Sequence, residues 1–392
     1  MRLLHTAKLV FEEFFENEVP PYAILSHRWD AKELSFQEFE DSRASPKFEK
    51  VKSFCAFALR NDHSYVWVDT CCIDKKSSAE LSEALNSMFT WYRKAEICYA
   101  HLSDVVWTVT ETVAAASDLN FELWEQCEQS DPFLRLSLEQ FRESAWFTRG
   151  WTLQELLAPV KVLFLDCNWE PIFTRQELHS VISGITGINP LYLQRPRLVT
   201  QASVAEKMSW ISRRETSRVE DMAYCLLGLF NVNMPLLYGE GKKAFLRLQI
   251  QIISQSDDES IFAWAGKQSG GAGMLASWPS AFSESGGISP CHRWHRPPYT
   301  MTNKGLQLYV PARAEDIADG SKKSIKFALN CKRGNDELEA PVIELERYKA
   351  SVRWRRINCR ELQWEEAPPG TQICGKAPSS MQCEPLFVHQ AR

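Results

Sequence analysis

Short apolar runs alternate with segments of helical periodicity over residues 1–165, and this alternation limits the folds open to the chain. Each run is too short for a buried helix and ends in polar residues, as buried strands do. Strands that alternate with helices form βαβ units, so the pattern predicts an α/β domain with a mostly parallel sheet and helices on both faces. The predicted strands are 22–26, 65–69, 97–102 and 162–165, and the predicted helices are 48–59, 79–93 and 151–157.

The segment 103–145 is longer than an ordinary α/β connection, which predicts an insertion with a helix near 133–141. Residues 177–255 have helical periodicity, and two sequences of capping-box form, Ser203-x-x-Glu206 and Ser217-x-x-Glu220, precede apolar runs there.

Beyond about Gly266, Gly, Ser and Pro dominate until about Pro298, and short alternating segments such as 306–310 and 325–329 follow. This pattern predicts a small β-rich region. We therefore expect three parts: an α/β domain at 1–165, a helical extension at 166–265 and a β-rich C-terminal domain at 266–392.

Composition and charge argue against several classes of protein. The net charge is -5 and the basic residues are scattered, so we expect no nucleic-acid partner. No apolar stretch reaches the roughly 18–20 residues of a membrane span. The 12 cysteines include no C-x-x-C, and adjacent Cys71 and Cys72 cannot form an ordinary disulfide. Cys291, His292 and His295 are too sparse for a metal site. Reduced thiols in a cytoplasmic protein are the expected state.

Polar residues follow the first two predicted strands, in the segments 26–30 and 69–74. In parallel sheets, ligands bind at the carboxyl ends of the strands. We therefore expect a site where these two segments meet.

Seven short strings carry a resemblance to a known family, and they lie at 22–29, 67–74, 81–88, 146–156, 205–210, 234–241 and 301–306. They resemble the fungal heterokaryon-incompatibility (HET) domain and the segments attached to it. The likeness spans about residues 20–310 and implies an effector of programmed cell death that responds to non-self. The chain has no G-x-x-x-x-G-K-[ST] motif, so it resembles the stand-alone form without a nucleotide-binding oligomerisation module.

A more distant resemblance concerns residues 20–165. The sequence Trp151-Thr-Leu-Gln-Glu155-Leu156 is similar to the W-C-x-x-E-L string of Toll/interleukin-1 receptor (TIR) domains. This likeness implies a flavodoxin-like sheet, with Glu155 as the catalytic carboxylate of NAD glycohydrolysis, NAD as substrate and no bound cofactor. The insertion at 103–145 departs from the TIR pattern. It would either form a lid over the site or block it.

The proposed chemistry needs few groups, since nicotinamide leaves as a neutral molecule and one carboxylate can stabilise the oxocarbenium charge. Trp151 and Glu155 are four residues apart, so on a helix they would share a face. Arg28 would meet a phosphate. The residues expected to line the binding site are Ser26, His27, Arg28, Trp29, Asp69, Cys72, Asp74 and Trp151.

Each assignment has a structural alternative. In the structural alternative, Glu155 is an ordinary exposed helix residue, and Trp151 fills the core beside Trp146 and Phe147. Arg28 pairs with Asp30 or Asp74, His27 is structural, and Ser26 and Asp69 terminate strands and cap loops. Packing is also the favoured role for Cys71 and Cys72 over that of a nucleophile.

Three functions follow from these alternatives. The first is a NAD glycohydrolase whose activity kills the cell. The second is a non-catalytic module that signals death by self-association or by recruiting a partner. The third is a regulatory scaffold whose C-terminal parts bind a partner and restrain the first domain.

Overall fold

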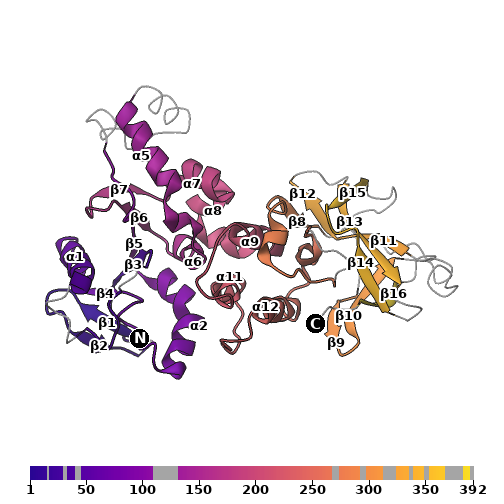
Figure 1. Cartoon of the computed structure of the whole chain (residues 1–392), viewed down its shortest axis with the longest axis horizontal. Helices are drawn as coiled ribbons and strands as arrows, with labels where there is room; N and C mark the ends of the chain where they lie inside the picture. The colour runs from indigo at the N-terminus through magenta and orange to yellow at the C-terminus, as the bar shows by residue number, and fades with distance from the viewer. Residues whose placement is uncertain are drawn as a thin grey trace. The chain divides into compact units, whose positions relative to one another are not determined.

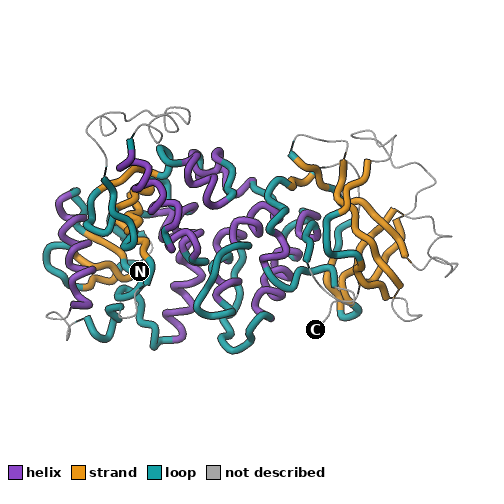
Figure 2. The backbone as a smooth tube through the Cα atoms, turned by 45° about the horizontal axis from the view of Figure 1, so that its top comes forward, coloured by secondary structure: helices purple, strands orange, loops and turns teal. Residues whose placement is uncertain are grey.

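The computed structural model describes most of the chain (Figures 1 and 2). The chain divides into two compact units. Unit 1 comprises Met1–Thr200 and Arg214–Leu236, and unit 2 comprises Gln201–Arg213 and Leu237–Arg392. The described residues are 1–15, 17–29, 33–39, 46–108, 131–266, 273–291, 297–311, 324–334, 339–347, 353–366 and 383–388.

Unit 1 contains a seven-stranded sheet with the order β2-β1-β4-β3-β5-β6-β7. The four adjacent strands β4, β3, β5 and β6 are parallel, whereas β1, β2 and β7 pair antiparallel at the two sides. The predicted mostly parallel α/β sheet is therefore confirmed. The strands are β1 (Arg2–His5), β2 (Phe11–Glu13), β3 (Ala23–His27), β4 (Tyr65–Trp67), β5 (Ile97–His101), β6 (Val162–Leu165) and β7 (Pro171–Thr174).

Helices α1 (Pro46–Arg60) and α2 (Ser78–Lys94) cover opposite faces of this sheet (Figure 1). On one face the ring of Tyr99 in β5 lies 5.0 Å from that of Phe57 in α1. On the other face Trp67 in β4 lies 5.9 Å from Tyr92 in α2. Successive strand residues point to alternate faces, so each strand contributes side chains to both layers.

Helix α6 (Thr152–Leu157) packs against β3 and α2, with Leu153 and Leu156 fully buried. The helix predicted near 133–141 is present as α5 (Pro132–Glu143). Residues 109–130 of the predicted insertion lie outside the described residues. The other helical elements of unit 1 are η1 (Ala145–Thr148), α7 (His179–Thr186), α8 (Pro190–Gln194), η2 (Pro196–Gln201, whose last residue belongs to unit 2), α10 (Asp221–Tyr224) and α11 (Leu227–Phe230).

Unit 2 combines short helices with two sheets whose strands pair mostly antiparallel, and the alternating C-terminal pattern predicts such a β-rich region. The predicted capping box at Ser203 and Glu206 is confirmed at the start of α9. The one predicted at Ser217 is wrong, because the next helix begins at Asp221 and Glu220 is its N-cap residue. The helical elements are α9 (Val204–Ile211), α12 (Lys243–Ile253), η3 (Glu259–Phe262) and η4 (Pro279–Phe282).

The β-rich part of unit 2 contains a second seven-stranded sheet, in which β15 pairs with β13 beside the path β11-β13-β14-β16-β10-β9, and a two-stranded sheet of β12 and β8. Within the described ranges, no helix of either unit is long and apolar enough to cross a membrane. The strands are β8 (Ile288–Pro290), β9 (Thr300–Thr302), β10 (Gly305–Pro311), β11 (Ser324–Ala328), β12 (Cys331–Arg333), β13 (Glu339–Arg347), β14 (Arg353–Ile357), β15 (Gln363–Glu366) and β16 (Cys383–Val388).

Candidate functional site

A chain of hydrogen bonds joins three side chains at the carboxyl end of β3. The indole Nε1 of Trp146 donates to Ser26 Oγ at 2.9 Å, and the Ser26 hydroxyl donates to Glu155 Oε2 at 2.5 Å. All three side chains are buried, and Glu155 is only 6% exposed. Strand β3, turn η1 and helix α6 each supply one of them, so the arrangement depends on the assembled fold.

Burial is the largest influence on the Glu155 carboxyl and raises its pKa from 4.5 to about 8. The negative charge of Asp69 raises this pKa further, whereas the Ser26 hydrogen bond and the charges of Arg149 and Arg214 lower it. Strongly perturbed pKa values are common among functional groups, and parallel sheets commonly bind ligands at the carboxyl ends of their strands, so this carboxyl is a candidate functional group.

Tyr92 of α2 lies close to the same carboxyl. Its hydroxyl donates to the Leu25 carbonyl at 2.9 Å, and burial together with the charge of Glu155 raises the pKa of Tyr92 well above 10.0. The Cys98 thiol on β5 is likewise buried, and burial and the Glu155 charge raise its pKa. Tyr92 and Cys98 therefore stay neutral near pH 7 beside Glu155.

Asp69 organises the adjacent loop. Its Oδ2 accepts from the Trp29 indole Nε1 at 2.8 Å, and Lys75 Nζ lies 3.7 Å from the centre of the same indole ring. His27 points toward Asp69 as well, with Nδ1 3.9 Å from Oδ1, and its Nε2 lies 3.5 Å from Glu33 Oε2. The structure therefore brings Trp29, Asp69 and His27 together beside the end of β3.

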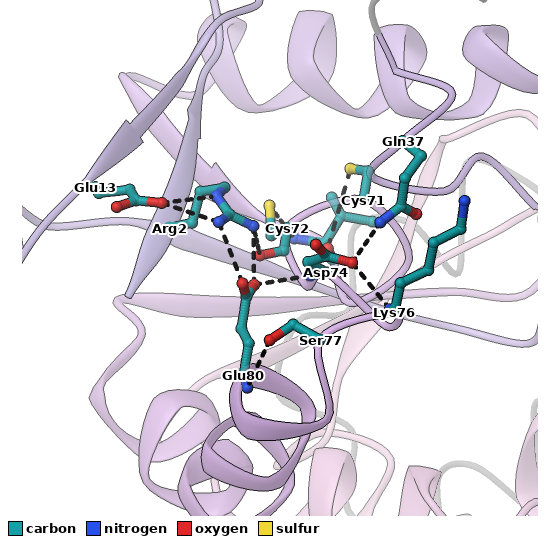
Figure 3. A network of polar contacts seen from close by, with 10 residues as sticks. Arg2, Glu13, Gln37, Cys71, Cys72, Asp74, Lys76, Ser77 and Glu80 are labelled. Carbon is teal, nitrogen blue, oxygen red and sulfur yellow. Dashed lines mark hydrogen bonds and ion pairs between the residues drawn. The ribbon is translucent and has the colours of Figure 1, made fainter.

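Cys72 and Asp74 belong to a different network, which ties the loop after β4 to β1 (Figure 3). Arg2 Nη1 donates to Glu80 Oε1 at 2.8 Å, and the same oxygen accepts from the Asp74 backbone at 2.7 Å. The Asp74 carboxylate accepts from Gln37 and from the Lys76 backbone. The Cys72 side chain is buried and accepts from the Val68 backbone at 3.4 Å. These contacts hold the loop in place, and none of them reaches Glu155.

Arg28 and Trp151 take no part in the hydrogen bonds that join Trp146, Ser26 and Glu155. Arg28 is exposed, and the described carboxylate of Asp74 has other partners; Asp30 lies outside the described residues. Trp151 is half-buried and occupies the N-cap position of α6, one residue before the helix begins. It is Trp146, from the preceding turn, that reaches Ser26.

Sequence reasoning assigned Trp146 to the core and did not single out Tyr92, Arg149 or Arg214. The first signal for Trp146 is its indole N–H, since buried tryptophan usually has a hydrogen-bond partner. Arg214 lies 59 residues beyond Glu155 in the chain, and no local pattern links the two. Within the described residues, no group of three or more His, Cys, Asp or Glu side chains could hold a metal ion.

In a comparison with known protein families, residues 22–155 match the family model "Heterokaryon incompatibility protein (HET)". Over 241 residues the chain is 44% identical to the "Vegetative incompatibility protein HET-E-1" of Podospora anserina. That alignment covers 60% of this chain but 16% of the relative. No solved structure matches the chain significantly. Residues 22–155 therefore correspond to a heterokaryon incompatibility (HET) domain.

Proposed function

We propose that the chain is an effector of vegetative (heterokaryon) incompatibility, which kills the cell after non-self recognition. The identity of 44% with a vegetative incompatibility protein supports this function. The trigger would be self-association or a partner that senses non-self. We place the action in the cytoplasm, a location that the free thiols of the described cysteines support.

We further propose that the HET domain hydrolyses the nicotinamide–ribose bond of NAD, with Glu155 as the catalytic carboxylate. The observation that carries this proposal is the buried Glu155 carboxyl held by Ser26 at the carboxyl end of β3. The parallel strands have the order β4-β3-β5-β6, which corresponds to the order 2-1-3-4 of flavodoxin-like sheets. This order supports the proposed likeness to TIR domains.

In the proposed reaction the bond between the nicotinamide nitrogen and ribose C1′ breaks, and its electron pair remains on the nitrogen. Nicotinamide leaves neutral, the ionised Glu155 stabilises the oxocarbenium charge, and water adds to C1′ with loss of a proton. Because Glu155 is 6% exposed, binding of NAD requires a rearrangement that opens the site. Self-association that drives this opening would couple activity to assembly.

The second candidate is a non-catalytic interaction module. The same low exposure of Glu155 favours it, together with the indole of Trp29, which is 42% exposed. Large apolar side chains on a surface are common in interfaces between proteins. In this function death follows from assembly alone, and Glu155 is a structural residue.

The two candidates are distinguished by NAD content and survival of cells that express the chain fused to an inducible dimerisation domain. Glu155→Gln preserves the size of the side chain but cannot ionise, and Glu143→Gln on the exposed end of α5 is the matched control. We expect wild type and Glu143→Gln to deplete NAD and kill, and Glu155→Gln to do neither at equal protein level. Death in all three with NAD intact would establish the interaction module instead.

A further inference from the structure

A short segment beyond the matched family domain pairs with the turn that leads into α6. The Glu215 backbone N–H donates to the Thr148 carbonyl at 2.7 Å, and the Gly150 N–H donates to the Glu215 carbonyl at 2.8 Å. Arg149 and Glu215 thereby form a parallel bridge. We call Arg214–Thr216 the strap, and it belongs to unit 1.

The strap packs tightly against its partner. A Cβ atom added at Gly150 would lie 2.5 Å from Thr216 Cγ2, closer than non-bonded carbon atoms approach. Glycine at this position leaves room for the Thr216 methyl group. The turn that carries Trp146 and opens helix α6 is therefore fixed from outside by the strap.

Arg214 makes the direct connection to the site. It is 5% exposed, and its Nη1 donates to the Arg149 carbonyl at 2.9 Å and to Thr152 Oγ1 at 3.0 Å. The Thr152 hydroxyl in turn donates to the Trp146 carbonyl at 2.7 Å. One guanidinium thus links the backbone of the Trp146 turn to the first turn of the helix that carries Glu155.

We propose that Arg214 is a positioning residue for Glu155: it fixes Trp146 and α6 on either side of Ser26 and, together with Arg149, supplies positive charge that favours the ionised carboxylate. This inference rests on the proposed catalytic role of Glu155, because only an ionised carboxylate stabilises an oxocarbenium ion. It gives the residues 214–216, outside the family domain, a part in the site.

The charges around Glu155 show why such a group is needed. Burial and Asp69 both disfavour its ionisation, and the positive groups that oppose them are Arg149 and Arg214. Burial lowers the pKa of Arg214 only to about 10, so it stays charged at neutral pH. The other polar and titratable side chains that face Glu155 are Ser26, Tyr92, Cys98 and Cys225.

The test is the titration of Glu155 in the full chain, followed by the infrared absorption of its protonated carboxyl group and assigned by subtraction of Glu155→Gln. Arg214→Met removes the charge at similar size, Arg214→Lys keeps it, and Arg213→Met at the exposed neighbour is the control. We expect the midpoint to rise by about one pH unit in Arg214→Met, a tenfold change in proton affinity. We expect a smaller rise in Arg214→Lys and none in Arg213→Met. An unchanged midpoint in Arg214→Met would overturn the proposal.

If the Arg214→Met variant folds poorly, a second measurement tests the proposal in its place. The cost in unfolding free energy of Arg214→Lys is compared in wild-type and Glu155→Gln backgrounds at about pH 9 and about pH 6. A coupling that appears only at the higher pH supports the proposal, whereas equal costs in all four cases reduce Arg214 to a structural residue. Neither measurement uses NAD. If the chain does not hydrolyse NAD, the proposed enzymatic function is refuted, but the role of Arg214 can still be tested. If NAD is hydrolysed, the pH profile of the reaction should shift upward in Arg214→Met.

Discussion

Ser26 and Glu155 lie 129 residues apart in the sequence and share a buried hydrogen bond of 2.5 Å between Oγ and Oε2. The same serine oxygen accepts from the Trp146 indole. The Ser26 hydroxyl therefore hydrogen-bonds both the Trp146 indole and the Glu155 carboxyl. Removal of this hydroxyl takes one hydrogen-bond partner from each of them.

Ser26→Ala should lower the unfolding free energy by about 1–3 kcal/mol, because it leaves the Trp146 N–H and the Glu155 carboxyl buried without this partner. It should also raise the pKa of Glu155, since the Ser26 hydrogen bond lowers it. Urea denaturation measures the first effect. Ser64→Ala, at an exposed position before β4, should be nearly neutral, and equal stability of the two variants would contradict the predicted role of Ser26.

Glu155 should make the stability of unit 1 depend on pH. Its pKa is about 8 in the folded chain against 4.5 for the free group, so between these values the folded state keeps a proton that the unfolded state releases. The unfolding free energy should therefore fall as pH rises from about 5 to about 8, by up to about 1.4 kcal/mol per pH unit. Denaturation of wild type and Glu155→Gln at several pH values isolates this contribution. Parallel pH dependences in the two proteins would show that Glu155 does not contribute.

Gly228→Ala should strongly destabilise the contact between α11 and α2. A Cβ at this position would lie 2.0 Å from Phe89 Cβ and 2.6 Å from its Cγ, so a helix must move to admit the methyl group. The matched control is Gly184→Ala in α7, where no atom lies within 4 Å and where Ala should stabilise the helix by about 0.5–1 kcal/mol. Melting temperatures that shift in the same direction would refute this pair of predictions.

Arg175 is fully buried and donates hydrogen bonds to four backbone carbonyl oxygens, so it stabilises the fold. Its Nη1 reaches Leu156 at 2.6 Å and Pro159 at 3.0 Å, its Nη2 reaches Val160 at 2.9 Å, and its Nε reaches Leu193 at 2.9 Å. Arg175→Met should cost about 3 kcal/mol or more, since these carbonyls lose their donors at the end of α6. Thermal unfolding against Arg197→Ala, at an exposed position, measures the difference. A loss no larger than that of the control would rule out this role.

The central strands were predictable because each lies in a continuous apolar run, including β4 and β6, which have only three and four residues. The edge strands β1, β2 and β7 are equally short, but each has only one or two consecutive apolar side chains beside polar ones. Such segments are not distinguished from loop by their pattern, and they are strands because a neighbouring strand offers them hydrogen bonds. The predicted division into 1–165, 166–265 and 266–392 stays a prediction.

The site was predictable in part. Ser26 and Glu155 follow from the end of a strand and from a resemblance, but the partner tryptophan follows from neither. Trp151 stands at the N-cap position of α6 with helical backbone angles, φ -63° and ψ -35°. The tryptophan that hydrogen-bonds Ser26 is instead Trp146, which lies in a 3-10 turn that sequence periodicity does not encode.

Unit 1 contains residues on both sides of the excursion Gln201–Arg213. A ribosome adds residues in order, so a nascent chain that has emerged through Thr200 possesses Glu155, Ser26 and Trp146 but not the strap. The hydrogen bonds from Arg214 and Glu215 form only after that excursion has been synthesised. The order of translation therefore delays completion of the site, and a chain released early would lack the residues that secure it.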